Sequence, residues 1–105
     1  MTVTITPENA QSVMNQELPV VVDFGATWCG PCKKVSSIMD ELAEQYDGKV
    51  VIAKADVDDC EDLAIEYKVR NVPTILFIKN GEVVDKQAGA AAKNVFVEKI
   101  EALLG

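Results

Sequence analysis

Two cysteines separated by two residues define the chemistry that this sequence can perform. They are Cys29 and Cys32, in the run Trp-Cys-Gly-Pro-Cys. A helix that begins at Cys29 would place Cys32 one turn further on, on the same face and within reach of a disulfide. The unpaired N–H groups and the positive end of that helix would favour the thiolate of Cys29. Since thiolates are the nucleophiles of disulfide exchange, the spacing predicts a reversible redox pair.

The exchange would proceed in two steps. Cys29 attacks a disulfide of a target protein and forms a mixed disulfide, and Cys32 then attacks Cys29 and releases the reduced target. This order calls for an exposed Cys29 and a shielded Cys32. Pro31 suits the first turn of a helix, where its missing N–H costs nothing, and Trp28 suggests an aromatic wall beside the reactive sulfur.

Other roles of a CxxC pair fit this sequence less well. The pair can be half of a zinc site, but Cys60 is the only further cysteine and the chain has no histidine. Structural zinc needs four N or S ligands, so we predict no metal site. Two packed structural thiols are the other alternative, and a helix start after a buried strand is a poor place for them. The lack of histidine also removes Cys–His proteolysis and Ser–His–Asp hydrolysis.

Length and composition describe one small domain over residues 1–105, and 49% hydrophobic residues suffice for its core without disulfide staples. Three cysteines are an odd and low number for a secreted disulfide scaffold. A net charge of −7 speaks against nucleic acid or an anionic membrane as a partner. Neither a signal-peptide pattern nor a membrane-length apolar run is visible. We therefore expect a soluble cytoplasmic protein.

The elements that must position the cysteines follow from the periodicity. The apolar run 19–24 predicts a strand that is covered on both faces, and the helical spacing in 31–46 predicts the helix that carries Cys32. The turn Lys79-Asn80-Gly81 predicts an antiparallel hairpin. The remaining expected elements are a strand at 3–6, a helix that starts at Thr6, a strand at 50–56, a helix that starts at Asp59, hairpin strands at 74–78 and 82–87, and a helix over 96–104. This βαβαβαββα order predicts an α/β fold, with helices on both faces of a mixed sheet.

The segment 22–33, Val-Asp-Phe-Gly-Ala-Thr-Trp-Cys-Gly-Pro-Cys-Lys, closely resembles the active-site segment of thioredoxins. Asn71-Val72-Pro73-Thr74 resembles their second site loop and Gly89 their third. The resemblance covers essentially the whole chain. It implies the thioredoxin fold, a five-stranded mixed sheet in the order first, third, second, fourth and fifth strand, flanked by four helices.

The resemblance also implies a function, that of a monomeric protein-disulfide reductase and electron carrier. Such a protein is recharged by thioredoxin reductase, an NADPH-dependent flavoprotein, and its implied targets include ribonucleotide reductase, peroxiredoxins and methionine sulfoxide reductase. No bound cofactor is implied, because the two sulfurs carry the electrons. Disulfide isomerases and oxidising relatives place histidine between the cysteines, and glutaredoxins place Pro-Tyr there. Gly30 and Pro31 therefore point to a reductant.

Two charged residues in the expected sheet have roles by resemblance. Asp23 interrupts an apolar strand, where burial should raise its pKa. In thioredoxins this acid helps to move the proton of Cys32, and the lysine that Lys54 matches tunes it. An Asp that caps loop amides at a strand end, and a lysine that faces solvent, are the alternatives.

The second and third loops imply substrate contacts. Thioredoxins hold the proline that Pro73 matches in the cis form, facing the dithiol. The backbone of Val72 would then pair with an extended substrate segment, as in β-augmentation. A proline that merely enters a strand is the alternative. Trp28 and Gly89 complete the expected substrate contacts.

Several positions depart from the common pattern. Gly25 stands where many bacterial thioredoxins have tryptophan, so this flank of the site should be less bulky. Ser37 replaces a helix-kinking proline, which leaves the bend of that helix and the redox poise open. Cys60 is either a regulatory thiol or a packing residue. The acidic residues around it lack the glycine and the spacing of an EF-hand, so we discard a calcium site.

Two other function classes remain beside the electron carrier. One is a binding or chaperone-like module in which the dithiol is incidental, and the pair with Asp23 and Pro73 speaks against it. The other is a thiol oxidase or isomerase, which Gly30-Pro31 and the absence of a visible leader disfavour.

Overall fold

A computed structural model describes the whole chain, residues 1–105. The elements are β1 (Val3–Thr4), α1 (Ala10–Met14), β2 (Val20–Gly25), α2 (Gly30–Gln45), β3 (Val51–Asp56), α3 (Glu61–Glu66), β4 (Thr74–Lys79), β5 (Glu82–Ala88) and α4 (Lys93–Leu104). The five strands form one sheet in the order β1-β3-β2-β4-β5. β1, β3 and β2 run parallel, and β4 and β5 run antiparallel to their neighbours. The predicted element order and strand order are confirmed.

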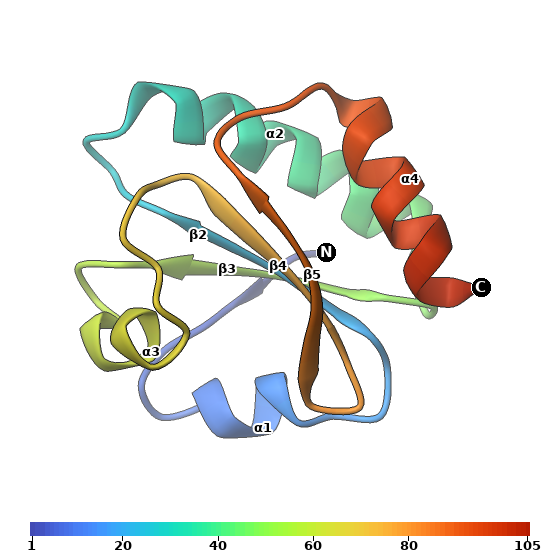
Figure 1. Cartoon of the computed structure of the whole chain (residues 1–105), viewed down its shortest axis with the longest axis horizontal. Coiled ribbons are helices and arrows are strands. Elements are labelled where there is room, and N and C mark those ends of the chain that lie inside the picture. Colours follow the sequence, from blue (N-terminus) through green and yellow to red (C-terminus); the bar gives the residue numbers. More distant parts are fainter.

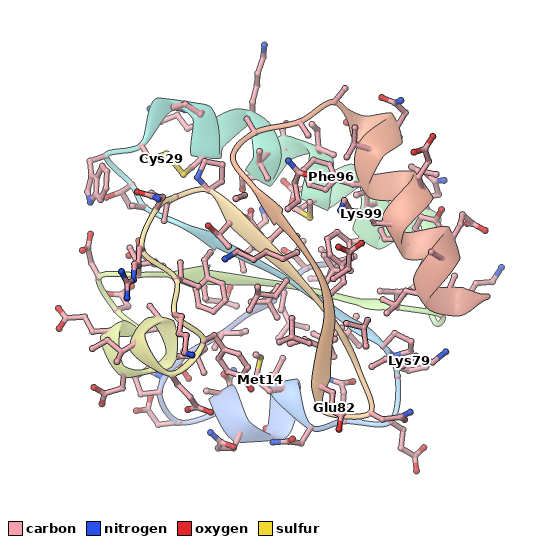
Figure 2. All side chains as sticks on the ribbon, viewed as in Figure 1. Met14, Cys29, Lys79, Glu82, Phe96 and Lys99 are labelled. Atoms are coloured by element: carbon pink, nitrogen blue, oxygen red, sulfur yellow. A yellow bond between two sulfur atoms is a disulfide. The ribbon has the colours of Figure 1, made fainter.

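The helices cover the sheet in two layers, with α2 and α4 on one face and α1 and α3 on the other (Figure 1). Side chains of a strand alternate between the two faces. Val20, Val22 and Phe24 of β2 accordingly belong to the core under α1 and α3. Val21 belongs to the core under α2 and α4. Met14 and Phe96 mark these two cores on opposite sides of the sheet (Figure 2). None of the helices is long and apolar enough to cross a membrane.

The hairpin between β4 and β5 forms where the sequence predicts it. Asn80 and Gly81 both adopt positive φ, 55° and 77°, as a two-residue turn of this hand requires. Asn and Gly adopt this conformation at the lowest cost of all residues, which explains their use here.

Two helices begin later than predicted, because short polar turns precede them. The Thr6 N–H donates to Asn9 Oδ1 at 2.8 Å, and the Asn9 N–H donates to Thr6 Oγ1 at 3.3 Å. This reciprocal turn delays the start of α1 until Ala10. Similarly, the Asp56 carboxylate accepts the N–H of Asp58 at 2.8 Å, and α3 begins at Glu61, not at Asp59.

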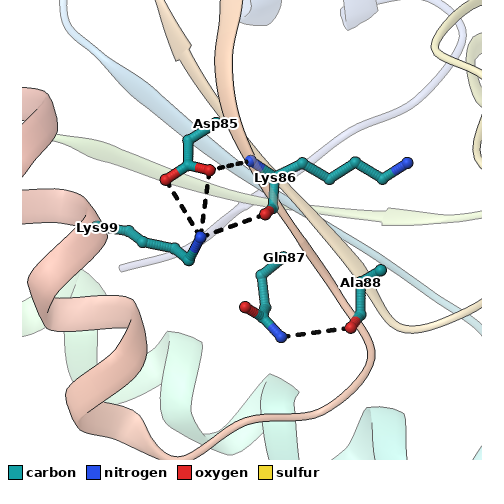
Figure 3. Close-up of polar contacts among 5 residues, drawn as sticks. All are labelled: Asp85, Lys86, Gln87, Ala88 and Lys99. Carbon is teal, nitrogen blue, oxygen red and sulfur yellow. Dashed lines mark hydrogen bonds and ion pairs between the residues drawn. The ribbon is translucent and has the colours of Figure 1, made fainter.

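α4 is attached to the edge strand β5 by one lysine (Figure 3). The ammonium group of Lys99 lies 3.2 Å from both carboxylate oxygens of Asp85 and 3.3 Å from the carbonyl oxygen of Lys86. It also lies 5.9 Å from the centre of the Phe77 ring. The register of β4 and β5 shifts next to these contacts, at Phe77 and Ile78. Lys99 therefore joins helix, edge strand and core at an irregular part of the sheet.

Candidate active site

The two cysteines lie at the junction that the sequence predicts, where the loop after β2 enters α2. Cys29 is the N-cap residue of α2, and its sulfur accepts the N–H of Cys32 at 3.2 Å. The two residues form a disulfide, with their Cα atoms 5.3 Å apart. Gly30 and Pro31 make the first turn of the helix between them. The predicted redox pair at a helix N-terminus is therefore present.

The expectation of an exposed Cys29 is wrong for the disulfide form. Cys29 is 6% exposed and Cys32 is 5% exposed. The reason is local packing, because Cys29 contacts the loop residues Ala26 and Val72 in a small apolar cluster. Its sulfur lies 3.8 Å from the carbonyl oxygen of Val72. A reaction partner must therefore reach the Cys29 sulfur from the surface formed by the surrounding residues, because the sulfur itself is hardly exposed.

Trp28 forms one wall of a groove beside this cluster. Trp28 is 69% exposed, and its indole N–H donates to Asp58 Oδ2 at 2.9 Å. A hollow of about 280 Å³ separates Trp28 from the segment 69–72. The contact of Asp58 with the indole is not predicted from the sequence, because nothing distinguishes this carboxylate from its acidic neighbours. Trp28 is thus an oriented aromatic wall, as predicted.

The second and third loops meet at the dithiol. The peptide bond between Val72 and Pro73 is cis, as the resemblance implies. The Gly89 N–H donates to the carbonyl oxygen of Pro73 at 2.8 Å, which fixes the end of β5 against this loop. The backbone N–H and C=O of Val72 pair with no other backbone group. The structure thus brings Cys29, Val72, Pro73 and Gly89 together and leaves a free backbone edge.

Asp23 lies in β2 on the face that is covered by α2, and it is 4% exposed. Its carboxylate makes no hydrogen bond, and the buried oxygen Oδ1 has no partner. Burial raises the pKa of Asp23 to about 7, with Lys54 acting against the increase and Asp40 adding to it. The predicted raised pKa is confirmed. The alternative role, a cap for loop amides, is excluded because no amide donates to this carboxylate.

A cavity of about 350 Å³ connects Asp23 with Cys32 and with the surface, and Gly25 and Ser36 are among its lining residues. A Cβ atom at Gly25 would lie 3.6 Å from the sulfur of Cys32. The missing side chain at position 25 therefore leaves the flank of Cys32 open, in agreement with the expectation of a less bulky site. Here Cys32 and the buried acid share one space.

Lys54 is the partner of Asp23 in the register of β2 and β3, and it lines the same cavity. Its ammonium group lies 2.7 Å from the carboxylate of Asp40 in α2. Lys54 is therefore half-buried beside the acid, and not a free lysine in solvent. Asp40 is not among the site residues predicted from the sequence. Its spacing of four and eight residues from Ser36 and Cys32 would have placed it on this side of the helix.

The two remaining departures lie away from the dithiol. Cys60 is a buried free thiol whose sulfur contacts the carbonyl oxygen of Ile5 at 3.4 Å. Burial, together with nearby acids, raises the pKa of Cys60, so the packing role fits better than the regulatory one. Ser37 is exposed in the middle of α2, which continues without interruption from Gly30 to Gln45.

The chain is similar to known proteins over nearly its whole length. A family model described as Thioredoxin matches residues 1–102. The chain is 50% identical to thioredoxin C-2 of Corynebacterium nephridii over 93 residues, 88% of this chain and 86% of that protein. It is 42% identical to the thioredoxin of Chlorobaculum thiosulfatiphilum over 101 residues, 95% and 94% of the two chains. It is 48% identical to the mitochondrial thioredoxin of Mus musculus over 99 residues, 94% of this chain but 60% of that longer one.

Proposed function

Because this chain belongs to the thioredoxin family and is a thiol-disulfide oxidoreductase with a Cys29–Cys32 redox pair, we propose that it reduces disulfides in other proteins, with Cys29 as the attacking sulfur. The observation that carries this assignment is the N–H of Cys32, which points at the Cys29 sulfur from the first turn of α2. A hydrogen bond from an amide and the positive end of a helix both favour a negative charge on that sulfur. Cys32 has no such donor, so it is the resolving residue.

The chemistry of one cycle balances without a bound cofactor. The Cys29 thiolate bonds to one sulfur of the target disulfide, and the other target sulfur leaves as a thiolate. Cys32 then loses its proton and attacks the Cys29 sulfur, which releases the second target thiolate and forms the Cys29–Cys32 disulfide. Asp23 is the acceptor that we assign to the Cys32 proton, since both residues line the same cavity. A pKa of about 7 suits a group that must take up and return a proton near neutral pH.

The substrate contact surface that we assign consists of Trp28, Val72, Pro73 and Gly89. The unpaired backbone groups of Val72 suit an extended segment of the target, which would lie as an added strand beside the sulfur. Trp28 would cover the segment from the other side of the groove. Gly30 and Pro31 keep the short helical turn that holds the two sulfurs together.

The electrons must come from a reductase, because the protein ends each cycle oxidised. We assign this role to an NADPH- and flavin-dependent thioredoxin reductase. Ribonucleotide reductase, peroxiredoxin and methionine sulfoxide reductase are the proposed targets, and neither nucleic acid nor a membrane surface suits a chain of net charge −7. The protein acts as a monomer in this account. A cytoplasmic location suits a dithiol reductant with a free thiol, and cell fractionation tests it.

The test is the reduction of insulin with NADPH and thioredoxin reductase, using three single cysteine variants. Cys29→Ser should abolish reduction and trap no target, whereas Cys32→Ser should accumulate a mixed disulfide through Cys29. Cys60→Ser is the matched control and should retain the parent rate, because Cys60 is buried away from the dithiol. If Cys29→Ser and Cys32→Ser both reduce insulin like the parent, the dithiol does not carry the electrons and the proposed mechanism is wrong. If the parent protein itself does not reduce insulin, the dithiol is incidental and the protein is a binding module.

A further inference from the structure

We propose that Asp40 is a positioning residue, which controls the charge of Asp23 by holding the ammonium group of Lys54. The inference deepens the proposed function, since it rests on Asp23 as the group that takes the Cys32 proton. It assigns to α2 a second contribution beside the cysteines. Through Asp40, α2 would also determine the position of the Lys54 ammonium group relative to Asp23.

The geometry places Lys54 between two carboxylates. It stands directly opposite Asp23 in the paired strands β2 and β3. Its ammonium group nevertheless lies against Asp40, at 2.7 Å, and makes no other hydrogen bond or ion pair. Asp23, in contrast, keeps a buried oxygen without a partner. The cation that would be the natural partner of the buried acid is therefore held by an exposed acid of the neighbouring helix.

No other group replaces Lys54 in this position. In the strand on the other side, β4, the residue opposite Asp23 is the apolar Ile75. The titratable and charged groups around Asp23 from the elements packed against β2 are Cys32, Lys33 and Asp40 from α2 and Lys54 and Asp56 from β3. Neither Lys33 nor Asp56 forms an ion pair. Of the two lysines near Asp23, only Lys54 is held in place by another side chain, that of Asp40.

Asp40 acts on Asp23 in two ways that have the same sign. Its own negative charge raises the pKa of Asp23. Its ion pair with Lys54 keeps that ammonium group on Asp40, which limits how far Lys54 lowers the pKa of Asp23. If Lys54 turned to Asp23, the carboxylate would stay ionised at lower pH and would be a weaker base for Cys32. Burial is the main cause that raises the pKa of Asp23 to about 7, and the Asp40–Lys54 pair limits how far Lys54 lowers it.

The test compares Asp40→Asn with Glu41→Gln in the reduced protein. Glu41 is the next residue of α2 and pairs with Lys93 at 3.4 Å, so both variants remove one negative charge and one surface ion pair from the same helix. The carboxyl carbon of Asp23 is followed by ¹³C NMR across pH 4–10. We expect Asp40→Asn to lower the pKa of Asp23 by roughly 0.2–0.7 of a unit, the size of an exposed charge pair. Glu41→Gln should leave it within error of the parent.

Lys54→Gln separates the positioning role from direct repulsion. This variant should raise the pKa of Asp23, because the cation that lowers it is gone. In the Lys54→Gln background, adding Asp40→Asn should move the pKa less than half as far as in the parent. The proposal is overturned if Asp40→Asn shifts the pKa no more than Glu41→Gln, or if its shift is undiminished without Lys54.

The pH profile of insulin reduction keeps this inference distinct from the proposed function. When the Asp23 pKa falls in Asp40→Asn, the acid limb of the profile for the resolving step should fall with it, by the same interval. A shift of the Asp23 resonance with an unmoved profile supports the role of Asp40 but removes Asp23 as the acceptor of the Cys32 proton. The NMR titration does not depend on turnover, so each claim can fail alone.

Discussion

Val21 and Asp23 show two uses of the same burial. They lie two residues apart in β2, on the same face, and are 0% and 4% exposed. Val21 is surrounded by apolar side chains from α2, α4 and the sheet. Asp23 lies at the edge of that core, next to a cavity, with a carboxylate oxygen that has no partner. The first position stabilises the fold, and the second destabilises it at the place where we propose the acceptor of the Cys32 proton.

The difference follows from where the strand ends. β2 leads directly into the loop that carries Cys29, so the last residues of the strand lie beneath the first turn of α2. Side chains further back, such as Val21, lie under the middle of α2, where Met39 and Leu42 close the core. α2 thus covers β2 with apolar side chains at Val21 and leaves a cavity between Cys32 and Asp23. This division of β2 can be tested at each position.

The largest effect should come from Asp23→Asn, as a change in the pH dependence of stability. Burial raises the folded-state pKa of Asp23 from 3.8 to about 7, so between these values the folded protein keeps a proton that the unfolded chain loses. The stability from Asp23 is therefore complete below pH 4 and is lost as the pH rises through 7. At 1.36 kcal/mol per unit, the loss is about 4 kcal/mol at pH 8.

Urea unfolding of the oxidised parent and Asp23→Asn proteins at pH 4, 6 and 8 measures this loss. The variant should gain on the parent as the pH rises, because an amide does not ionise. A stability difference that stays constant from pH 4 to pH 8 would show that Asp23 is not a buried acid with a raised pKa.

Val21→Ala should have a smaller effect that does not depend on pH. The substitution removes two methyl groups from a closed apolar core, which should lower the free energy of unfolding by about 2 kcal/mol. The same urea measurements give the value, and the difference from the parent should be equal at pH 4 and pH 8. A pH-dependent difference would mean that the two positions of β2 are coupled, and that the division between them fails.

Lys99→Met should have the smallest effect on the free energy of unfolding. It compares two lysines that each pair with an aspartate, Lys99 with Asp85 and Lys54 with Asp40. Lys99 joins α4 to β5 (Figure 3) and does not line the cavity, whereas Lys54 lines it together with Asp23. Because the side chain of Asp85 is 45% exposed and solvent screens the pair, the loss of stability should stay below about 1 kcal/mol and decrease with added salt. Insulin reduction should keep the parent pH profile. A shifted profile would show that surface charge in general, and not the position of Lys54, tunes the site.

Much of the fold can be predicted from the sequence, because a few signals are strong. The apolar run that becomes β2 permits only a strand covered on both faces, and Asn80-Gly81 permits only a tight hairpin turn. The starts of α1 and α3 cannot be predicted as well. The side chains of Thr6 and Asn9 accept each other's backbone N–H, and the Asp56 carboxylate accepts the N–H of Asp58. These local turns compete with the helix for the same N–H groups.

The candidate site was predicted in its residues but not in all of its contacts. Residue types show that Cys29, Cys32 and Asp23 can do chemistry, but exposure depends on packing between segments distant in the sequence. Val72 packs against the cluster of the two cysteines, with its carbonyl oxygen 3.8 Å from the Cys29 sulfur, and no local pattern reveals this contact. Asp40 was missed for a related reason. An exposed acid on a helix is ordinary in sequence, and it gains significance only where the sheet brings Lys54 to it.

If Cys29 is the attacking sulfur, it must be ionised and reachable at the head of α2 once the disulfide is reduced. The most direct measurement is the rate at which iodoacetamide alkylates each cysteine of the reduced protein at pH 7, located by peptide mass analysis, with the urea-unfolded chain as reference. We expect Cys29 to react roughly threefold to tenfold faster than in the unfolded chain, and Cys32 to react much more slowly. Alkylation of Cys29 no faster than in the unfolded chain, or equal rates at the two cysteines, would contradict this expectation.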